Sequence, residues 1–366
     1  MTAAVAVVGI SHMGASVADR ERLHLAPEEA AALSRSLADA RSEAVVLATC
    51  NRTEIYVAAR DIARALEHAR RALVDLAART LSPSAIYACG GRHAAAHLFR
   101  VAAGLESVVP GDTHVAAQVR RAHHLARQAG ASGPLLDRLF EAASAASKRV
   151  HAQTSLSRCP TSIPAAAIAA AERIASPLAN RRLLIVGAGR IARVAALSAA
   201  RRGCRDIVVA NRTLARAHEL ATKVSGRAVT LDELPAELGA ADVVVAATSG
   251  RGFILTAQHT GAIRARPDGG PLAIFDLALP RDVDPMLRRL GGTQLCDLDD
   301  LALLAVQAGE RWADVERARA IAAREAARYE TWRHARAAAP AIAACATTPS
   351  RHAVRSSIGT PTSLRG

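Results

Sequence analysis

Cys50 directly follows an apolar segment, VVLAT, and precedes Asn51 and Arg52. A cysteine thiolate is the strongest common protein nucleophile near neutral pH. If the connection after the apolar segment is extended, Arg52 projects to the same side as Cys50, where a guanidinium would bind a carboxylate and favour the thiolate. A free cysteine is also commonly a small buried hydrophobe. Taken alone, this segment leaves a nucleophile and a core residue as equal alternatives.

A glycine turn between an apolar run and a helical pattern is the second candidate for chemistry. The segment RRLLIVGAGRIARVAAL has the spacing G-x-G-x-x-A, in which the glycines permit a tight turn and close approach of the backbone to a pyrophosphate. The start of the following helix supplies N–H groups and a positive dipole end to phosphates. A turn that serves only chain reversal is the alternative. The predicted cofactor contacts are Gly187, Ala188, Gly189, Arg190, Ile191 and Ala192.

Residues 207–210 form a second apolar run, and Asn211, Arg212 and Thr213 follow it. Sites for NAD usually carry an acidic residue at this point, whereas an arginine favours the 2′-phosphate of NADP. These three residues are therefore predicted to bind NADPH. Further on, the segment PRDVDP follows another apolar run, so we expect it at the carboxyl end of the sheet near the nicotinamide; an ordinary proline-stiffened turn fits its sequence equally well.

Alternating apolar runs and helical patterns in the first third of the chain predict an α+β or α/β domain. Residues 49–53 join two predicted strands, which places Cys50 in a tight connection. The predicted strands cover residues 4–10, 44–48 and 55–58, and the predicted helices cover residues 27–41, 61–79, 92–103, 115–129 and 134–153.

The pattern changes after residue 154. Residues 155–164 contain two prolines and several hydroxyl residues, as in a linker, and from residue 182 strands and helices alternate as in a βαβ series. After Cys296 one long helical pattern follows, with aspartates at its start, and its length suggests a spine or a dimerisation arm. Residues 340–366 are rich in Thr, Ser, Pro and Arg and are predicted to be disordered.

Composition limits the class of protein. Hydrophobic residues make up 51% and charged residues 22% of the 366 residues, as in an ordinary globular protein. The net charge of +14 fits a polyanionic partner such as RNA, but a coding bias toward arginine and alanine explains it equally well. Six dispersed cysteines with no C-x-x-C pair favour a reducing compartment over a zinc or disulfide framework. No run of 18 apolar residues is present, so we expect a cytoplasmic protein without membrane association.

Four blocks of sequence together resemble the glutamyl-tRNA reductase family. They are T-C-N-R at residues 49–52 with Glu54, HLFRVAAGLESVVPGDTHVAAQV at residues 97–119, GAGRIA with ANRT, and FDLALPRDVDP at residues 275–285. The blocks follow the order of that family and cover roughly residues 5–335. T-C-N-R together with G-L-E-S is far more specific than a glycine fingerprint.

The resemblance implies a reaction. The thiolate of Cys50 attacks glutamate esterified to tRNA(Glu), the tRNA leaves, and NADPH reduces the thioester to glutamate-1-semialdehyde. This is the first committed step of tetrapyrrole (porphyrin, haem) biosynthesis. A thioester accepts hydride more readily than an ester, so the scheme is chemically sound. The family also implies a homodimer and transfer of the product to an aminomutase.

The resemblance also assigns site residues. Cys50 and His97 are implied as catalytic. His93 and His97 lie one turn apart on a predicted helix, but no third ligand is in view, so no metal is expected. An acid, base or orienting role for His97 competes with that of a surface histidine. The implied substrate-binding residues are Thr49, Asn51, Arg52, Ser107, Asp112, Thr113, His114 and Gln118.

The chain departs from the family at three places. Where the family has G-E-x-Q, this chain has Asp112 and His114, which predicts weaker binding of the glutamyl group. The linker lacks the usual serine-rich pattern, and the C-terminal helical region stops early, which leaves dimer formation open. Two alternatives therefore stay open: a catalytically impaired tRNA-binding or scaffold paralogue, and another NADP oxidoreductase of the shikimate dehydrogenase type.

We therefore predict an α/β protein. It has an N-terminal α/β catalytic domain, a doubly wound Rossmann-type domain for NADP, and a long C-terminal spinal helix with a truncated helical dimerisation region. The predicted boundaries are residues 1–155 for the catalytic domain that recognises glutamate and tRNA, 160–297 for the NADPH domain, 298–340 for the spinal helix, and 341–366 for a disordered tail.

Overall fold

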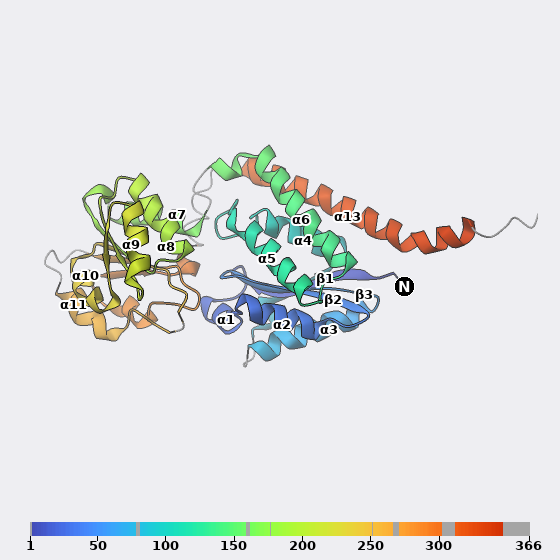
Figure 1. Ribbon diagram of the computed structural model, residues 1–366, viewed down its shortest axis with the longest axis horizontal. Coiled ribbons are helices and arrows are strands. Elements are labelled where there is room, and N and C mark those ends of the chain that lie inside the picture. The colour runs from blue at the N-terminus through green and yellow to red at the C-terminus, as the bar shows by residue number, and fades with distance from the viewer. Residues whose placement is uncertain are drawn as a thin grey trace, which may run out of the picture.

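The computed structural model contains two layered bodies of strands and helices and one long helix, α13, that lies along the first body (Figure 1). No helix among the described residues is both long and apolar enough to span a membrane. The structure describes residues 2–77, 81–158, 162–175, 177–250, 252–265, 271–301 and 312–346.

The N-terminal half is built on an antiparallel sheet with the strand order β2-β3-β1-β4. Helices cover both faces, so successive residues of one strand belong to different cores: Val5 and Val7 pack on the side of α4, α5 and α6, whereas Ala6 and Val8 pack on the side of α2 and α3. The elements are β1 Ala4–Ser11, α1 Val17–Arg22, α2 Pro27–Leu37, β2 Ser42–Ala48, β3 Arg52–Ala59, α3 Ile62–Leu76, β4 Ile86–Gly90, α4 Arg92–Ala102, α5 His114–Gln128 and α6 Pro134–Gln153.

The second half is a parallel sheet with the order β10-β9-β8-β5-β6-β7 and helices on both faces. This is the doubly wound order of dinucleotide-binding folds, in which ligands bind at the carboxyl ends of the strands where the order reverses, here between β5 and β8. The elements are α7 Ile163–Ile174, β5 Arg182–Val186, α8 Arg190–Arg201, β6 Asp206–Ala210, α9 Leu214–Lys223, β7 Arg227–Val229, α10 Leu234–Ala240, β8 Val243–Ala246, α11 Thr260–Arg264, β9 Leu272–Asp276 and β10 Thr293–Cys296.

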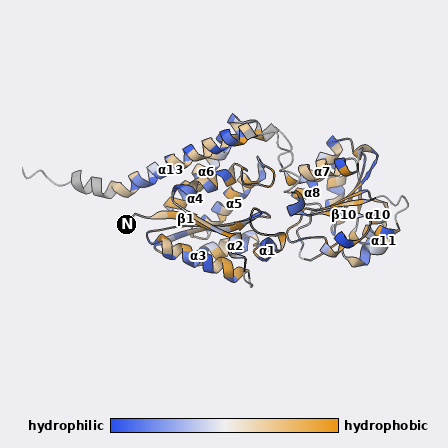
Figure 2. Cartoon of the chain, turned by 180° about the vertical axis from the view of Figure 1, so that it is seen from behind, coloured by the Kyte–Doolittle hydropathy of each residue, from blue (hydrophilic) through white to orange (hydrophobic). Residues whose placement is uncertain are grey.

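Helix α13 (Trp312–Ala346) packs on α4 and α6 of the N-terminal half. Its Tyr329 hydroxyl donates to the carbonyl of Leu135 at 3.2 Å, and its Glu325 pairs with Arg149. Figure 2 shows mostly apolar colour on the strands and mixed colour on the helices, as expected where helices shield a sheet from water.

The predicted α/β fold class is confirmed, and the open choice for the first third is settled as an antiparallel α+β arrangement. The prediction missed α1, β4 and α7, which begins at Ile163, within the residues 155–164 that were predicted as a linker. The helix predicted over residues 27–41 ends at Leu37, and α13 continues through Pro340 to Ala346 although disorder was predicted there. Alanines on both sides favour the helix, and a proline inside a helix removes one hydrogen bond without necessarily ending it. Residues 302–311 of the predicted spinal helix and 347–366 of the predicted tail lie outside the described residues.

Gly9 tests the register of the N-terminal sheet, because it lies opposite Glu54 on β3. A Cβ at this position would lie 2.6 Å from the carbonyl oxygen of Thr53 and 2.8 Å from Cγ of Glu54. We expect Gly9→Ala to lower the free energy of unfolding by about 1–3 kcal/mol, measured by urea denaturation. Gly261→Ala on α11 is the control, since its Cβ would meet nothing within 4 Å. Equal stability of the two variants would contradict this packing.

Candidate active site around Cys50

Cys50 lies in the short turn, residues 49–51, that joins β2 to β3. Ala48 pairs with Thr53 in the sheet, and the N–H of Thr49 donates to the carbonyl of Arg52 at 2.8 Å, which closes the turn. The Thr49 hydroxyl oxygen accepts from the N–H groups of Asn51 and Arg52, each at 3.2 Å. The tight connection predicted from the sequence is confirmed, and the thiol is held at the end of two buried strands.

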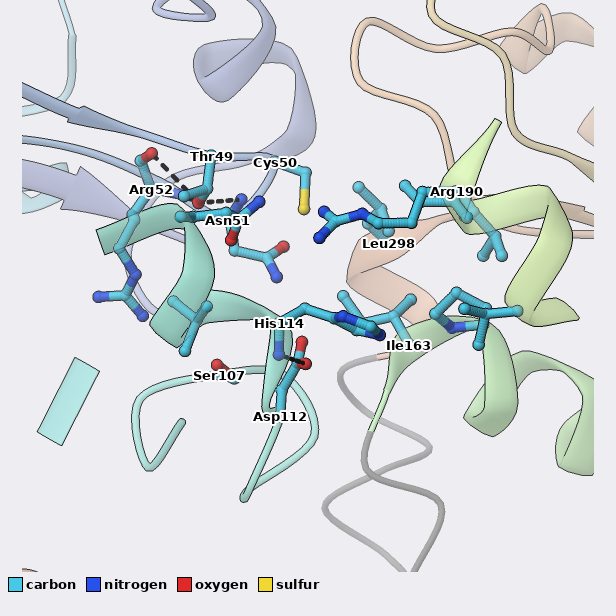
Figure 3. A pocket seen from close by; sticks show the side chains of 16 residues that line it. Thr49, Cys50, Asn51, Arg52, Ser107, Asp112, His114, Ile163, Arg190 and Leu298 are labelled. Carbon is cyan, nitrogen blue, oxygen red and sulfur yellow. Dashed lines mark hydrogen bonds between the residues drawn. The ribbon is translucent and has the colours of Figure 1, made fainter. Parts of the chain in front are cut away.

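A cavity of about 60 Å³ opens beside the thiol, between the N-terminal half and the nucleotide-binding half (Figure 3). The structure brings most of the predicted substrate residues to it, together with Arg190 and Ile191 of the glycine turn. Thr113 and His97 do not line it. Its lining is Thr49, Cys50, Asn51, Arg52, Ser107, Asp112, His114, Val115, Gln118, Ile163, Pro164, Arg190, Ile191, Val194, Leu277 and Leu298.

Two glycines bring Asp112 to the cavity. Gly104 has a φ of +76°, and a Cβ there would lie 2.5 Å from the carbonyl oxygen of Asp112. Gly111 has a φ of +92° and donates its N–H to the carbonyl of Gly104 at 3.0 Å. The Asp112 carboxylate accepts from the N–H of His114 at 2.8 Å, at the start of α5. Burial raises the pKa of Asp112, which His114 and Arg190 partly oppose. Asp112 and His114, the residues that depart from the family pattern, are therefore joined by a hydrogen bond from the backbone of one to the side chain of the other.

Glu54 is fully buried and receives four hydrogen bonds. Its carboxylate accepts from Nη1 of Arg52 at 2.7 Å, from the hydroxyls of Tyr56 at 2.6 Å and Tyr87 at 2.5 Å, and it lies 2.9 Å from Nε2 of His97. Burial alone would raise the pKa of Glu54, but Arg52 and His97 hold it well below its ordinary value. We call Glu54 and these four partners the Glu54 network.

An acid, base or orienting role was expected for His97, and the structure places its ring on Glu54 and against the edge of Tyr87. Glu54 therefore lies between the imidazole and Arg52, and it is hydrogen-bonded to both. Arg52 is the member of the network that lines the cavity. A motif match indicates that a histidine is needed, but it does not say which way the ring points. The geometry supports the orienting role among those considered.

The cations that favour the thiolate also differ from expectation. Arg52 uses Nη1 for Glu54 and Nη2 for the carbonyl of Glu106, so its charge is matched within the Glu54 network. Burial raises the pKa of the Cys50 thiol; Arg20 and Arg190 lower it, and Asp112 raises it further. Figure 3 shows Arg190 reaching from α8 toward Cys50.

Arg20 was missed because α1 has six residues, too few for a helical period to be visible. A local signal does exist. Ser16 precedes the helix, its hydroxyl oxygen accepts from the N–H of Asp19 at 3.2 Å, and its hydroxyl donates to the Asp19 carboxylate at 2.8 Å. The spacing Ser-x-x-Asp is a helix-start signature that identifies α1 from sequence.

The glycine turn has the geometry needed for a dinucleotide. Gly187 has a φ of +111°, and a Cβ there would lie 2.6 Å from the carbonyl oxygen of Ala247, so a larger residue is excluded. Gly189 begins α8 without a side-chain cap, and a Cβ on it would meet nothing within 4 Å, which leaves the helix N-terminus open to phosphate. Ala192 is fully buried against the sheet. These residues fit a nicotinamide dinucleotide.

Arg212 is exposed after β6, beside the turn in which the Asn211 amide donates to the carbonyl of Thr213 at 3.0 Å. Its guanidinium lies near Gly250, beyond the end of β8. The glycine turn follows the carboxyl end of β5 in the same parallel sheet, so the predicted NADPH residues lie together at the carboxyl ends of the strands.

The PRDVDP segment is a loop next to the cavity that is held by side-chain hydrogen bonds. The Asp276 carboxylate accepts from the N–H groups of Ala278 at 3.1 Å and Val283 at 3.0 Å. Asp282 binds Thr248 beyond β8, at 2.6 Å to both its N–H and its hydroxyl. Burial raises the pKa of Asp276 to about 7. Leu277 of this loop lines the cavity, so the loop lies at the carboxyl end of the sheet as expected.

Comparison with known proteins agrees with both halves of this arrangement. The family model described as "Glutamyl-tRNAGlu reductase, N-terminal domain" matches residues 8–154, and "Shikimate / quinate 5-dehydrogenase" matches residues 169–304. The glutamyl-tRNA reductase of Deinococcus radiodurans is 40% identical over 81% of this chain and 83% of its own length. That of Rubrobacter xylanophilus is 40% identical over 81% and 70%. The solved glutamyl-tRNA reductase from Methanopyrus kandleri aligns with 90% of this chain and 79% of its own, at 31% identity and a TM-score of 0.45.

His12 gives the site a testable pH dependence. Burial, with Arg52 and Arg20 nearby, lowers the pKa of His12 to about 4. Between that value and the ordinary value of 6.5 the folded chain binds fewer protons than the unfolded chain, so stability falls as the pH is lowered through this window. We expect His12→Gln to lose less unfolding free energy than the wild type between about pH 7.5 and about pH 5.

The measurement is urea denaturation at both pH values. Exposed His93→Gln on α4 is the matched control and should keep the wild-type slope. Asp276 acts in the opposite sense in much of this window, because its raised pKa makes stability fall as the pH rises, so each variant is compared with the wild type. An unchanged slope for His12→Gln would mean that His12 is not held neutral.

Proposed function

Because the chain belongs to the glutamyl-tRNA reductase family, which carries out the first step of tetrapyrrole synthesis, we propose that it reduces glutamyl-tRNA(Glu) to glutamate-1-semialdehyde with NADPH. The observation that carries the proposal is the position of Cys50. Its thiol faces a cavity lined by the T-C-N-R turn on one side and by Arg190 and Ile191 of the dinucleotide turn on the other. A nucleophile and a site for a hydride donor therefore share one space.

The reaction on Cys50 proceeds in two stages. The thiolate attacks the carbonyl carbon of the glutamyl ester, the bond between this carbon and the ribose oxygen breaks, and the tRNA leaves with a proton on its hydroxyl. NADPH, when bound, supplies a hydride to the thioester carbonyl. The carbon–sulfur bond then breaks, the aldehyde leaves, and a proton restores the Cys50 thiol.

The turn and the loop before α5 would hold the glutamyl group. Arg52 lines the cavity in a fixed orientation, with Nη1 on Glu54 and Nη2 on the carbonyl of Glu106, and its positive charge suits a substrate carboxylate. Asp112 and His114 would face the same group from the opposite wall. The substrate contacts we propose are Thr49, Asn51, Arg52, Ser107, Asp112, Thr113, His114 and Gln118, with His97 orienting Arg52 through Glu54.

We assign a different role to each part of the chain. We assign recognition of glutamate and tRNA to residues 1–155, cofactor binding to residues 160–297, and a spinal and dimerisation role to residues 298–340. A second copy of the chain and an aminomutase that takes up the reactive aldehyde are the proposed protein partners. The proposed location is the cytoplasm.

Replacement of the nucleophile tests the mechanism. With glutamyl-tRNA(Glu) and NADPH, we expect Cys50→Ser to form no semialdehyde above background, because a serine hydroxyl is scarcely ionised near neutral pH. Without NADPH, labelled glutamate should stay covalently attached to the wild type and not to the variant. Cys89→Ser, a thiol on β4 outside the cavity, should behave as the wild type. Equal product from Cys50→Ser and the wild type would refute the thioester route.

Replacement of Arg212 tests the cofactor assignment. We expect Arg212→Ala to raise KM for NADPH about tenfold or more while KM for NADH changes little, since a guanidinium favours the 2′-phosphate. Arg205→Ala is the control, because Arg205 is an exposed arginine at the opposite end of β6. Steady-state kinetics with both cofactors provide the measurement. Parallel losses with NADPH and NADH would remove Arg212 from cofactor selection.

A further inference from the structure

Arg20, on α1, is a buried cation that contacts the turn holding the nucleophile. Only 2% of its surface is exposed. Its Nη1 donates to the carbonyl of Cys50 at 3.2 Å and to Oδ1 of Asn51 at 3.1 Å. Burying a charge is costly unless it is paired, so a guanidinium at this depth needs an ionic partner.

That partner comes from the segment after β10, which packs into the core of the nucleotide-binding half through Leu298 and Leu301. Nη2 of Arg20 pairs with the Asp299 carboxylate, which also accepts from the N–H of Val17 at 2.9 Å. Glu21, the next residue of α1, pairs with Arg281 of the PRDVDP loop at 2.7 and 2.9 Å. Helix α1 is therefore fixed to the second half by two adjacent ion pairs, and one of them continues to the Cys50 turn.

The charged groups that act on the thiol come from three elements. Arg20 of α1 and Arg190 of α8 lower the pKa of Cys50, and Asp112, before α5, raises it. Arg190 is exposed and belongs to the turn proposed to bind the dinucleotide, so a bound cofactor would change its surroundings. Arg20 is enclosed and held at both ends of its fork, so its charge is present whether or not the cofactor is bound.

We propose that Arg20 is a positioning residue that fixes the Cys50 turn and favours the thiolate, and that Asp299 of the nucleotide-binding half holds Arg20 in place. This proposal rests on the nucleophilic role of Cys50 proposed above. It means that the half that binds the hydride donor also sets the reactivity of the thiol in the other half.

The test measures the thiol itself and needs neither tRNA nor NADPH. The full-length protein is alkylated with iodoacetamide over a range of pH, and the rate at Cys50 is followed by mass spectrometry of the tryptic peptide covering residues 42–52. Arg20→Gln keeps a donor for the turn and loses the charge, so we expect the midpoint of the profile to rise by about one pH unit, with alkylation about tenfold slower near neutral pH. Arg20→Lys keeps the charge, and its midpoint should stay near the wild-type value.

Glu21→Gln provides the matched control, because it breaks the neighbouring ion pair without touching the Cys50 turn. Its midpoint should stay where it is in the wild type. An unchanged midpoint in Arg20→Gln, or an equal rise in Arg20→Gln and either of the other variants, would overturn the proposal. Failure here leaves the Cys50→Ser result as it stands, so the two proposals are separable.

A double-mutant cycle tests the role of Asp299. Its side chain is 40% exposed, so replacing Arg20 leaves no enclosed carboxylate without a partner. If Asp299 acts through Arg20, kcat of Arg20→Gln/Asp299→Asn should lie within about twofold of kcat of Arg20→Gln alone. Independent, multiplying losses in the double variant would show that Asp299 has a separate function and would overturn this part of the proposal.

Discussion

A carboxylate without access to water, in the middle of a sheet covered on both faces, constrains the whole N-terminal half. Every residue of β3 is buried, and Glu54 in its centre stays ionised because four donors surround it. Two donors come from β3 itself, and the others are Tyr87 on β4 and His97 on α4. Removing one donor would leave a buried charge short of a partner, which is far more costly than losing a surface ion pair. The network thus fixes how β4 and α4 dock, and through Arg52 it fixes one wall of the cavity.

The same network explains how the site separates two tasks that both require a cation. Arg52 lines the cavity, but its charge is matched by Glu54 within the network, so it is not the cation that acts on the thiol. The pKa of the thiol is lowered by other arginines, Arg20 on α1 and Arg190 on α8. Recognition and activation therefore depend on different side chains, held by different parts of the fold.

Local patterns were enough for much of this arrangement. The strand–turn–strand unit around Cys50 and the strand–turn–helix unit around Gly187 have sequence signals within about a dozen residues, and both were predicted. The docking of the halves has no local signal, because Arg20 and Asp299 are separated by 279 positions. Strand β4 was missed since it is short and none of its residues is buried, so its sequence carries no clear alternation. The orientation of His97 depends on a carboxylate 43 positions away, which no spacing rule encodes.

The short turn between β2 and β3 has a consequence for how this site can vary. Side chains alternate between the faces of a strand, so inserting one residue into the turn while the sheet keeps its pairing would require a bulge, and slipping β3 by one position would exchange its faces. In the second case Glu54 would leave its four donors and face the core on the side of α2 and α3. Loop length, usually the most freely altered feature of a protein, is here tied to the interior, so lengthening the segment that carries the nucleophile requires either a bulge or a change of register in β3.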